Sequence, residues 1–414
     1  MARRDSRRLG VWLDGRRVAE LDQPKFPRIR LRYTEEALEA WPRNSPVVSC
    51  SLPLTDRPQD ALVFCKGLLP EGQALQALAA RARVSTFDTF ALLARYGRDV
   101  AGALVIAEEP PDAAREGVEP YTDASLREAV EELDEFPLGA HDDSELSLAG
   151  LQDKLLLVDL GDGRWGRPVH GRPSTHILKR DDLRHPGLVE AEGRCLALAR
   201  AVGLTTIDHR VERLGDTPCL IVSRFDRAPA DDGRGVRRIH QEDVCQATGV
   251  DPDGAGGRGK YERAGGPGFR DVARLLDEHA ADPQDELDRL VAAATFTVVI
   301  GNADAHGKNV ALLHPSPGTV TLAPLYDTVP TALWPKLRAE AAMTVDRVAK
   351  LADVTLDDLA AEAAAWPHAR RRAREVAART AQQLADAATD GTIPADTDVA
   401  RFVRDRAARL LATA

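Results

Sequence analysis

Several residues with the chemistry of phosphoryl transfer lie in and just after one stretch, residues 295–314 (TFTVVIGNADAHGKNVALLH). Asp304 follows the apolar part of this stretch, Asn309 comes five residues later, and Asp327 follows in LYDT, after one predicted hairpin. A carboxylate can orient a hydroxyl group and take its proton. Asn and Asp oxygens are ligands that Mg²⁺ prefers. These residue types therefore suit transfer of a phosphoryl group from a nucleotide to a hydroxyl.

The same spacing, Asp-x₄-Asn followed by a second Asp, is typical of the catalytic loop and metal-binding aspartate of protein kinases. It predicts that Asp304 is the catalytic base and that Asn309 and Asp327 hold Mg²⁺. His306 and Lys308 lie in the same loop, and we expect them to steady it or to contact the γ-phosphate. The alternative is a polar turn in which Asp304 and Asn309 bind local backbone groups.

Other parts of a phosphotransferase precede this loop in the order that kinases use. A stretch of small residues at 147–152 leads into an apolar strand, and its backbone N–H groups could lie against phosphates. Lys179 ends the strand THILK, and the predicted helix at 187–202 carries two glutamates. A strand lysine followed by a helix glutamate holds the α- and β-phosphates in kinases. Each part alone also fits a plain loop or a solvated charge, but their order favours a phosphotransferase.

The composition describes an ordinary globular protein. The 414 residues are 43% hydrophobic and 29% charged, which at about 150 residues per domain predicts two or three domains. The formal charge of −10 argues against binding of nucleic acid by this chain alone. The five cysteines have no CxxC pair, which favours reduced thiols. No apolar run reaches the length of a membrane span and no signal peptide is evident, so we expect a cytoplasmic protein.

The expected elements divide the chain into three parts. Strands and helices alternate over residues 1–108, which predicts an N-terminal α+β subdomain with a hairpin turn at Asp14 and Gly15. Strands dominate residues 109–235, after a Pro-rich linker over 109–122. Helices dominate residues 236–414, which contain the catalytic loop.

Several local features are also predicted. Residues 49–54 read as a short strand that Pro53 interrupts, Ser85 or Thr86 as a helix N-cap, and residues 240–249 as a helix. Two polar, Gly-rich segments are predicted to be a connection or mobile loop (227–238) and a mobile loop (251–268).

Many short motifs together resemble one family of bacterial kinases. They are SLAGLQDKLLL, THILK, VSRFDR, HQEDVCQATG, GNADAHGKN and LYDT, together with the N-terminal stretch GLLPEGQALQALAARARVSTFDTFALLARYGRDVAGAL. This pattern is similar to the HipA family, the serine/threonine-kinase toxins of toxin–antitoxin systems, and covers nearly the whole chain. The resemblance implies a two-lobed, kinase-like α+β fold with an extra N-terminal α+β subdomain and an all-helical C-terminal lobe.

The resemblance also implies roles for particular residues. It implies that Asp304 is the base, that Asn309 and Asp327 bind Mg²⁺, and that Lys179 contacts the phosphates of ATP. Ser147 matches the family's autophosphorylation site, where added charge would eject the phosphate loop and switch the kinase off. The residues expected to bind the nucleotide are Leu148, Ala149, Gly150, Leu151, Gln152, Asp153, Lys154, Lys179, Ser223, Phe225, His306 and Lys308. Ser223 stands where some members carry an acid, so we expect backbone rather than side-chain contacts at the hinge.

The partners that the resemblance implies are proteins. Family members phosphorylate translation factors such as the glutamyl aminoacyl-tRNA synthetase and act in persistence. They are neutralised by HipB, a helix-turn-helix antitoxin, and the pair represses its own operon, so contact with DNA is indirect. Two alternatives stay open: a lipid or small-molecule kinase related to the phosphatidylinositol kinases, and a non-catalytic corepressor that only binds an antitoxin. Intact Asp304 and Lys179 argue against the second.

Overall fold

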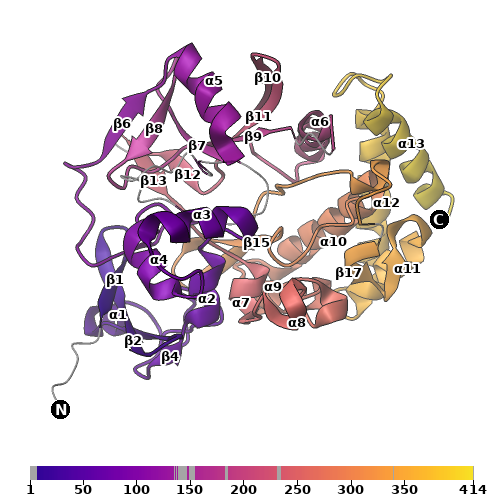
Figure 1. Cartoon of the computed structure of the whole chain (residues 1–414). Helices are drawn as coiled ribbons and strands as arrows, with labels where there is room; N and C mark the ends of the chain where they lie inside the picture. Colours follow the sequence, from indigo (N-terminus) through magenta and orange to yellow (C-terminus); the bar gives the residue numbers. More distant parts are fainter. Residues whose placement is uncertain are drawn as a thin grey trace. The chain divides into compact units, whose positions relative to one another are not determined.

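The computed structural model describes residues 7–134, 136, 138, 147–148, 154–181, 185–230, 235–338 and 340–413, with its elements labelled in Figure 1. The chain forms two compact units. The first, called the N-terminal unit, comprises Met1–Arg180, Glu212–Glu242 and His314–Gly318. The second, called the C-terminal unit, comprises Asp181–Val211, Asp243–Leu313 and Thr319–Ala414. Each unit is described by itself.

The N-terminal unit begins with a five-stranded antiparallel sheet in the order β4–β3–β2–β1–β5. Its strands are β1 (Arg8–Leu13), β2 (Arg16–Lys25), β3 (Arg28–Tyr33), β4 (Gln59–Asp60) and β5 (Val105–Ala107). The predicted hairpin is confirmed, because Asp14 and Gly15 connect β1 to β2 with φ angles of 50° and 75°, the left-handed conformation that hairpin turns favour. Alternate residues of β3 are buried, as expected for a sheet with one face in the core.

Four helices pack beside this sheet and complete its core: α1 (Glu35–Ala40), α2 (Leu62–Gly67), α3 (Gly72–Ala82) and α4 (Thr89–Tyr96). One local prediction is wrong here. Asp88, not Ser85 or Thr86, caps α4 by accepting the Ala91 N–H at 3.1 Å, while Ser85 closes a turn that precedes the helix. The short strand expected at 49–54, interrupted at Pro53, consists of a single bridge between Ser49 and Leu52.

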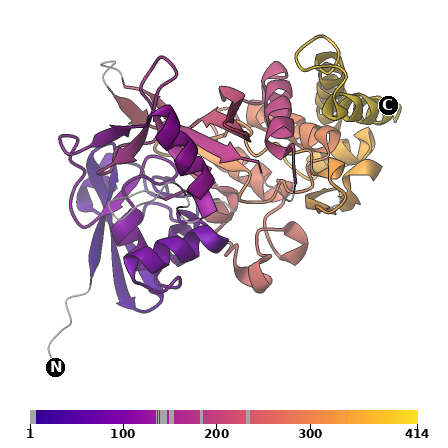
Figure 2. The same ribbon diagram turned by 45° about the horizontal axis from the view of Figure 1, so that its top comes forward.

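A six-stranded sheet follows in the order β10–β11–β9–β7–β8–β6. Its strands are β6 (Gly117–Pro120), β7 (Lys154–Asp159), β8 (Trp165–Val169), β9 (His176–Arg180), β10 (His209–Leu214) and β11 (Thr217–Ser223). Helix α5 (Asp123–Glu131), with the turn η1 (Glu132–Asp134) after it, packs beside these strands (Figure 2). Leu155 and Leu157 contact the α5 side, whereas Leu156 joins the core of the first sheet. Strand β7 is therefore buried on both faces, which explains its unbroken apolar sequence.

Two segments predicted to be irregular contain strands. The linker expected over 109–122 contributes β6, which pairs with β8. The polar segment 227–238 forms a second small hairpin, in which β12 (Arg227–Pro229) pairs with β13 (Val236–Arg238). These three strands are only three or four residues long, too short to show the alternation that identifies a strand in sequence.

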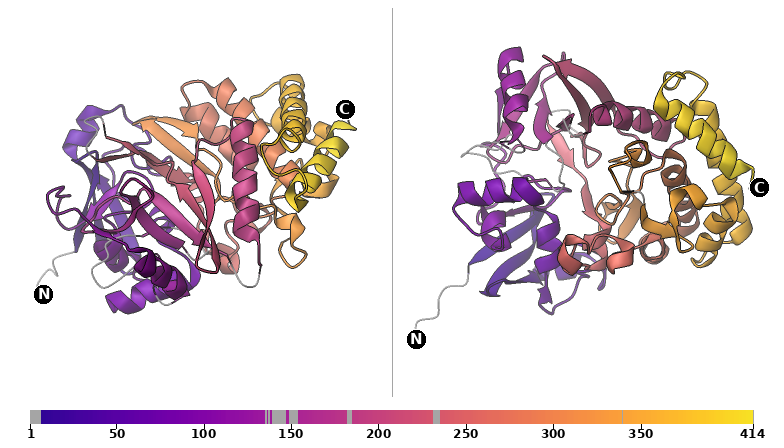
Figure 3. Two further views of the ribbon diagram at one scale, coloured as in Figure 1. Left: turned by 90° about the horizontal axis from the view of Figure 1, so that it is seen from above. Right: turned by 45° about the vertical axis from the view of Figure 1, so that its right-hand side comes forward.

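The C-terminal unit is built on a central helix, α10 (Pro283–Ile300), which packs against α9, α12 and α13. Figure 3 shows α13, in yellow, beside α12. The other long helices are α6 (Leu188–Ala201), α9 (Phe269–His279), α11 (Leu356–Ala364), α12 (Arg370–Ala387) and α13 (Asp398–Leu411). Shorter helices are α7 (Val244–Thr248), α8 (Gly254–Gly257), η2 (Glu262–Ala264), η3 (Thr331–Leu333) and η4 (Leu351–Asp353). Among the described residues, no helix is long and apolar enough to cross a membrane.

The expectation of an all-helical C-terminal lobe needs a correction. The strands β17 (Glu340–Val345) and β18 (Val348–Lys350) form a hairpin within this unit. A three-stranded sheet in the order β14–β15–β16 is made by β14 (His240–Asp243), β15 (Ala311–Ser316) and β16 (Thr319–Leu322). Residues 240–243 are thus a strand, and the helix predicted over 240–249 begins at Val244, after Asp243 caps it.

Candidate active site

The predicted catalytic loop begins where α10 ends. Gly301 ends the helix in the left-handed conformation, with φ of 71°. A β-carbon at this position would lie 2.9 Å from atoms of Ala332 and Phe402, so glycine is needed both for the backbone angle and for the close packing. The chain therefore leaves the helix sharply and enters the loop at Asn302.

The loop is held by hydrogen bonds between its own residues and by one threonine. Asn302 Oδ1 accepts the Asp304 N–H at 3.0 Å, and Asn309 Nδ2 donates to the Asp304 carbonyl at 3.0 Å. The buried Thr331 hydroxyl accepts the Ala303 N–H at 2.8 Å. Asp304 and Asn309, five residues apart, are thus fixed relative to each other before any ligand binds.

The Asp304 carboxylate lies in a mixed environment of burial and positive charge. Oδ1 accepts a hydrogen bond from the Tyr261 hydroxyl at 3.1 Å, and the side chain remains 44% exposed. Burial raises the pKa of Asp304, as does the charge of Asp327, whereas Lys260, the Tyr261 hydrogen bond and Arg338 act in the opposite direction. The net result is a pKa above the ordinary value for Asp, which makes the carboxylate a better proton acceptor.

Asp327 follows the β15–β16 hairpin, as predicted, and has an unusual backbone. Its φ angle is 50°, a left-handed conformation that is uncommon outside glycine and is found at functional sites. Its carbonyl accepts Asn302 Nδ2 at 3.2 Å and the Val329 N–H at 3.0 Å. Because the charge of Asp327 raises the pKa of Asp304, the two carboxylates are close enough to interact. The structure therefore brings Asp304, Asn309 and Asp327 together.

The other two predicted loop residues, His306 and Lys308, are buried. Lys308 Nζ lies 3.4 Å from the carboxylate of Asp243, which also caps α7. His306 Nδ1 accepts the Lys308 N–H at 3.3 Å, and its Nε2 lies 4.0 Å from Asp304 Oδ2. Lys308 therefore contacts the N-cap of α7, and His306 contacts the backbone of the loop itself.

The predicted phosphate-binding residues lie in the N-terminal unit. Lys154 in β7 stands directly opposite Lys179 in β9, and both are buried, at 8% and 6% exposure. Like charges directly opposite each other on neighbouring strands repel, and a polyphosphate is an anion that could lie between them. Residues 149–153 of the predicted phosphate loop lie outside the described residues.

Ser147 is buried at the edge of this region. Its hydroxyl donates to the Leu68 carbonyl at 2.9 Å, and its N–H donates to the Asp99 carbonyl at 2.9 Å. Leu148 is also buried, in the core beside the first sheet. A kinase that phosphorylated Ser147 would first have to move it out of this position.

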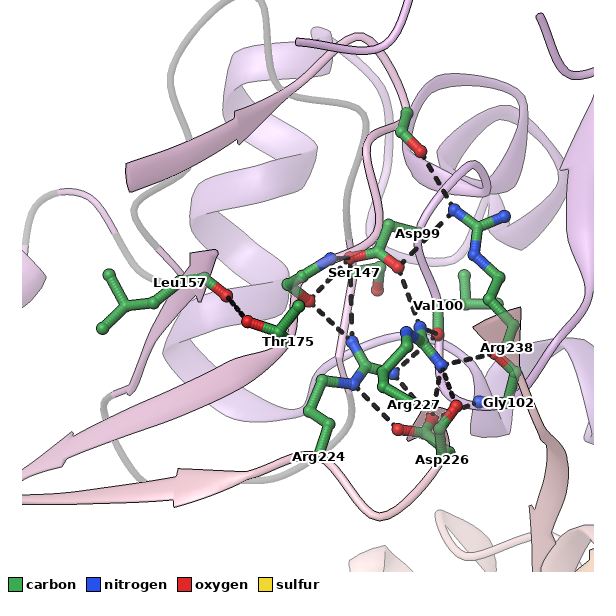
Figure 4. A network of polar contacts seen from close by, with 12 residues as sticks. Asp99, Val100, Gly102, Ser147, Leu157, Thr175, Arg224, Asp226, Arg227 and Arg238 are labelled. Carbon is green, nitrogen blue, oxygen red and sulfur yellow. Dashed lines mark hydrogen bonds and ion pairs between the residues drawn. The ribbon is translucent and has the colours of Figure 1, made fainter. Parts of the chain in front are cut away.

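Ser223 and Phe225 are the chain neighbours of Arg224, which belongs to a buried network of charges drawn in Figure 4. Arg224 binds Asp226 through Nη2 at 2.7 Å, and Arg227 binds Asp99 through Nη2 at 2.9 Å. Asp99 also accepts the Ser174 hydroxyl at 2.7 Å. Burial alone would raise the pKa values of Asp99 and Asp226, but the charges of these arginines lower both. The motif SRFDR is thus anchored by paired charges.

Two parts of this arrangement were missed from the sequence. Tyr261 lies in the Gly-rich segment that was predicted to be mobile, and its only signal was an isolated aromatic residue in a polar run. Asp99 is 125 residues from Arg224 in the chain, so its pairing with the SRFDR motif has no local signal.

Comparison with known proteins identifies the family. Residues 9–107 match the model of the HipA N-terminal domain, and residues 146–388 match that of the HipA-like C-terminal domain. The putative kinase Y4mE of Sinorhizobium fredii (strain NBRC 101917 / NGR234) is 38% identical over 391 residues, which is 91% of each chain. The serine/threonine-protein kinase toxin HipA of Shewanella oneidensis is 29% identical over 330 residues, or 76% of this chain and 73% of that protein.

A solved structure agrees with these matches. The structure of Shewanella oneidensis MR-1 HipA with HipB and operator DNA has a TM-score of 0.81 and 26% identity, and covers 98% of this chain and 96% of that one. The fold and these relatives define a kinase. The chain belongs to the HipA family. The predicted α+β, kinase-like fold class, apart from its all-helical C-terminal lobe, and the predicted kinase activity are therefore confirmed, while the roles of the individual site residues stay predictions.

Proposed function

We propose that this chain is a serine/threonine protein kinase that uses ATP and Mg²⁺ and acts as the toxin of a toxin–antitoxin pair. The observation that carries the proposal is the geometry of the catalytic loop. Asp304, with a raised pKa, is tied through its backbone to Asn309 and interacts with the charge of Asp327. The proposed base and one proposed metal ligand, Asn309, belong to the same loop, and the other, Asp327, follows the β15–β16 hairpin.

The residues present fit a magnesium ion. Asn309 and Asp327 would supply the hard oxygen ligands that Mg²⁺ prefers. Two interacting acids, Asp304 and Asp327, form a place where a cation is favourable. A bound Mg²⁺ would neutralise charge on the phosphate oxygens of ATP.

The nucleotide would be held by charge and by backbone groups of the N-terminal unit. Lys179 and Lys154 form a pair of buried cations on adjacent strands that suits the α- and β-phosphates. Residues 148–154 would supply the phosphate loop, and Ser223 to Phe225 the contacts to adenine. The buried ion pairs of Arg224 with Asp226 and of Arg227 with Asp99 would hold this last segment in place, because the two arginines lie on either side of Phe225 in the chain.

Phosphoryl transfer then needs one proton acceptor. The half-exposed Asp304 carboxylate would accept a hydrogen bond from a serine or threonine hydroxyl and take its proton as the oxygen bonds to phosphorus. The bond from the γ-phosphorus to ADP breaks in the same step. We assign Lys308 and His306 to steadying the loop, because Lys308 pairs with Asp243, and His306 accepts the Lys308 N–H and lies 4.0 Å from Asp304.

Regulation and partners complete the proposal. Phosphorylation of Ser147 would add about two negative charges beside the backbone of Asp99, where the serine is now buried, so the phosphorylated segment would leave. A HipB-like antitoxin is proposed because the Shewanella HipA structure contains HipB and operator DNA, with DNA contacted through the antitoxin. A translation factor such as an aminoacyl-tRNA synthetase is the proposed target, in the cytoplasm, with persistence as the outcome.

The class of acceptor is tested by offering protein and lipid side by side. The purified chain is incubated with Mg²⁺ and γ-labelled ATP, with either heat-treated host lysate protein or phosphatidylinositol vesicles. We expect label on serine or threonine of protein, identified by mass spectrometry, and none on lipid. Transfer to lipid alone would overturn the proposal.

A further inference from the structure

The Gly-rich segment 251–268 is docked on the catalytic loop at several points. The Gly307 N–H donates to the Lys260 carbonyl at 3.1 Å. Gly307 packs so tightly on Pro267 that a β-carbon would lie 2.5 Å from Pro267 Cγ. On its other side the segment reaches β17, where Glu262 accepts the Thr344 N–H. The segment is therefore a structural partner of the loop in the C-terminal unit.

Tyr261 is the residue of this segment that reaches the predicted base. Its hydroxyl donates to Asp304 Oδ1 at 3.1 Å. The edge of the ring meets His306, with ring centroids 5.3 Å apart and planes at 80°, and the guanidinium carbon of Arg338 lies 4.2 Å from the ring centroid. A cation over the ring and an aromatic edge contact are both favourable. The ring is thus fixed from two sides, and its hydroxyl is aimed at one oxygen of the carboxylate.

We propose that Tyr261 is a positioning residue of the kinase reaction, which holds the Asp304 carboxylate in the orientation that the acceptor hydroxyl requires. A carboxylate rotates easily about its last torsion, so a base with no fixed partner samples several orientations. The hydrogen bond from Tyr261 engages Oδ1 and presents Oδ2 to the acceptor. The inference rests on the proposed role of Asp304 as the base.

The exposure of the Asp304 side chain distinguishes two roles that Tyr261 could have, positioning the carboxylate or blocking access to it. A tyrosine that occupied the acceptor's place would cover the carboxylate, but the Asp304 side chain is 44% exposed. His306 Nε2 lies 4.0 Å from Oδ2, beyond hydrogen-bond distance. Oδ1 is engaged by Tyr261 while the side chain as a whole stays partly exposed, as a positioned general base requires.

The test uses the full-length protein and the variant Tyr261→Phe, which keeps the ring contacts and removes only the hydroxyl. Phosphoryl transfer from labelled ATP to a pooled serine/threonine peptide library gives kcat and the KM for ATP. We expect kcat to fall by on the order of ten- to a hundredfold, the cost of a misplaced catalytic group, with the KM for ATP within about twofold of the wild-type value. Tyr96→Phe is the matched control, because Tyr96 makes a comparable hydrogen bond, to the Leu78 carbonyl at 3.0 Å, within the N-terminal unit.

A second variant tests the orientation of the ring independently. Arg338→Lys keeps the positive charge but loses the planar guanidinium that stacks on Tyr261. We expect it to lower kcat in the wild-type background and to have no further effect in Tyr261→Phe, because a residue that acts through the hydroxyl has nothing left to position.

The outcomes are distinct. If Tyr261→Phe keeps the wild-type kcat while Asp304→Asn is inactive, the positioning role is wrong and the base assignment stands. If Tyr261→Phe raises the KM for ATP or lowers the Tm without a selective loss of kcat, its role is structural, which also overturns the inference. If Asp304→Asn is fully active, the proposed function itself fails.

Discussion

The Nζ atom of Lys308 lies 3.4 Å from the Asp243 carboxylate, and the two side chains are only 4% and 9% exposed. Asp243 also caps α7, where its side chain accepts the Gln246 N–H at 2.8 Å. One carboxylate therefore joins the catalytic loop to the start of a helix. This pair explains how Lys308 can belong to the loop without contacting a phosphate.

Replacing Lys308 tests that explanation. Lys308→Met would leave the buried Asp243 charge without this partner, which typically costs about 3–5 kcal/mol of unfolding free energy. Urea unfolding should show this loss, with the KM for ATP little changed. A variant of normal stability with a strongly raised KM would instead place Lys308 on the nucleotide.

Gly307 should tolerate no side chain. In Gly307→Ala the new methyl group would lie 2.5 Å from Pro267 Cγ and 2.8 Å from Cys245 Sγ, so the Gly-rich segment must shift. We expect a lower Tm, by overpacking that costs about 1–3 kcal/mol, together with loss of activity. Gly254→Ala is the control within the same segment, because it has open space around it. Equal Tm values for the two variants would show that the segment is not docked on the loop.

Folding stability should fall in mild acid because of a histidine. Burial and the neighbouring His314 lower the pKa of His240 to about 4, whereas the Val48 carbonyl, Glu242 and Asp226 act in the opposite direction. Between this value and the ordinary pKa of about 6.5, the unfolded chain binds a proton that the folded chain does not. Stability is therefore complete above pH 6.5 and decreases by about 1.4 kcal/mol per pH unit as the pH falls toward 4.

The measurement is urea unfolding at pH 7 and pH 5 for the wild-type protein and His240→Gln. The glutamine retains a donor for the Val48 carbonyl, which His240 Nε2 contacts at 2.8 Å, but it does not titrate. The wild-type protein should lose more stability than the variant between the two pH values. An identical loss in both would assign the pH dependence to other groups.

The sequence predicted those features that rest on local spacing. The separation of Asp304, Asn309 and Asp327, the strand that carries Lys179 and the turn at Gly15 are all set within short segments, and the structure contains each of them. The fold class followed from motifs that span the chain. The order of these motifs along the chain was informative because each motif lies within a single short segment of the chain.

Contacts between distant segments could not be predicted. Tyr261 meets Asp304 across 43 residues, and glycine-rich composition around it gave the opposite expectation of a mobile loop. Residues 240–243 form a strand rather than a helix. Glu242, for example, binds the backbone N–H of Cys50 and the ring of His314, and neither partner is visible from the local pattern. The buried pairing of Asp99 with Arg227 is of the same kind.

The central claim is that Asp304 is the base of a magnesium-dependent phosphoryl transfer. The most direct measurement compares the rate of transfer from labelled ATP to the peptide library, with Mg²⁺, for the wild-type protein, Asp304→Asn and Asp277→Asn. Asp277 is an exposed acid in α9 and controls for the loss of one charge. We predict that Asp304→Asn lowers the rate by about 10²–10⁴-fold, with Asp277→Asn unchanged. Equal rates for Asp304→Asn and the wild-type protein would contradict the account.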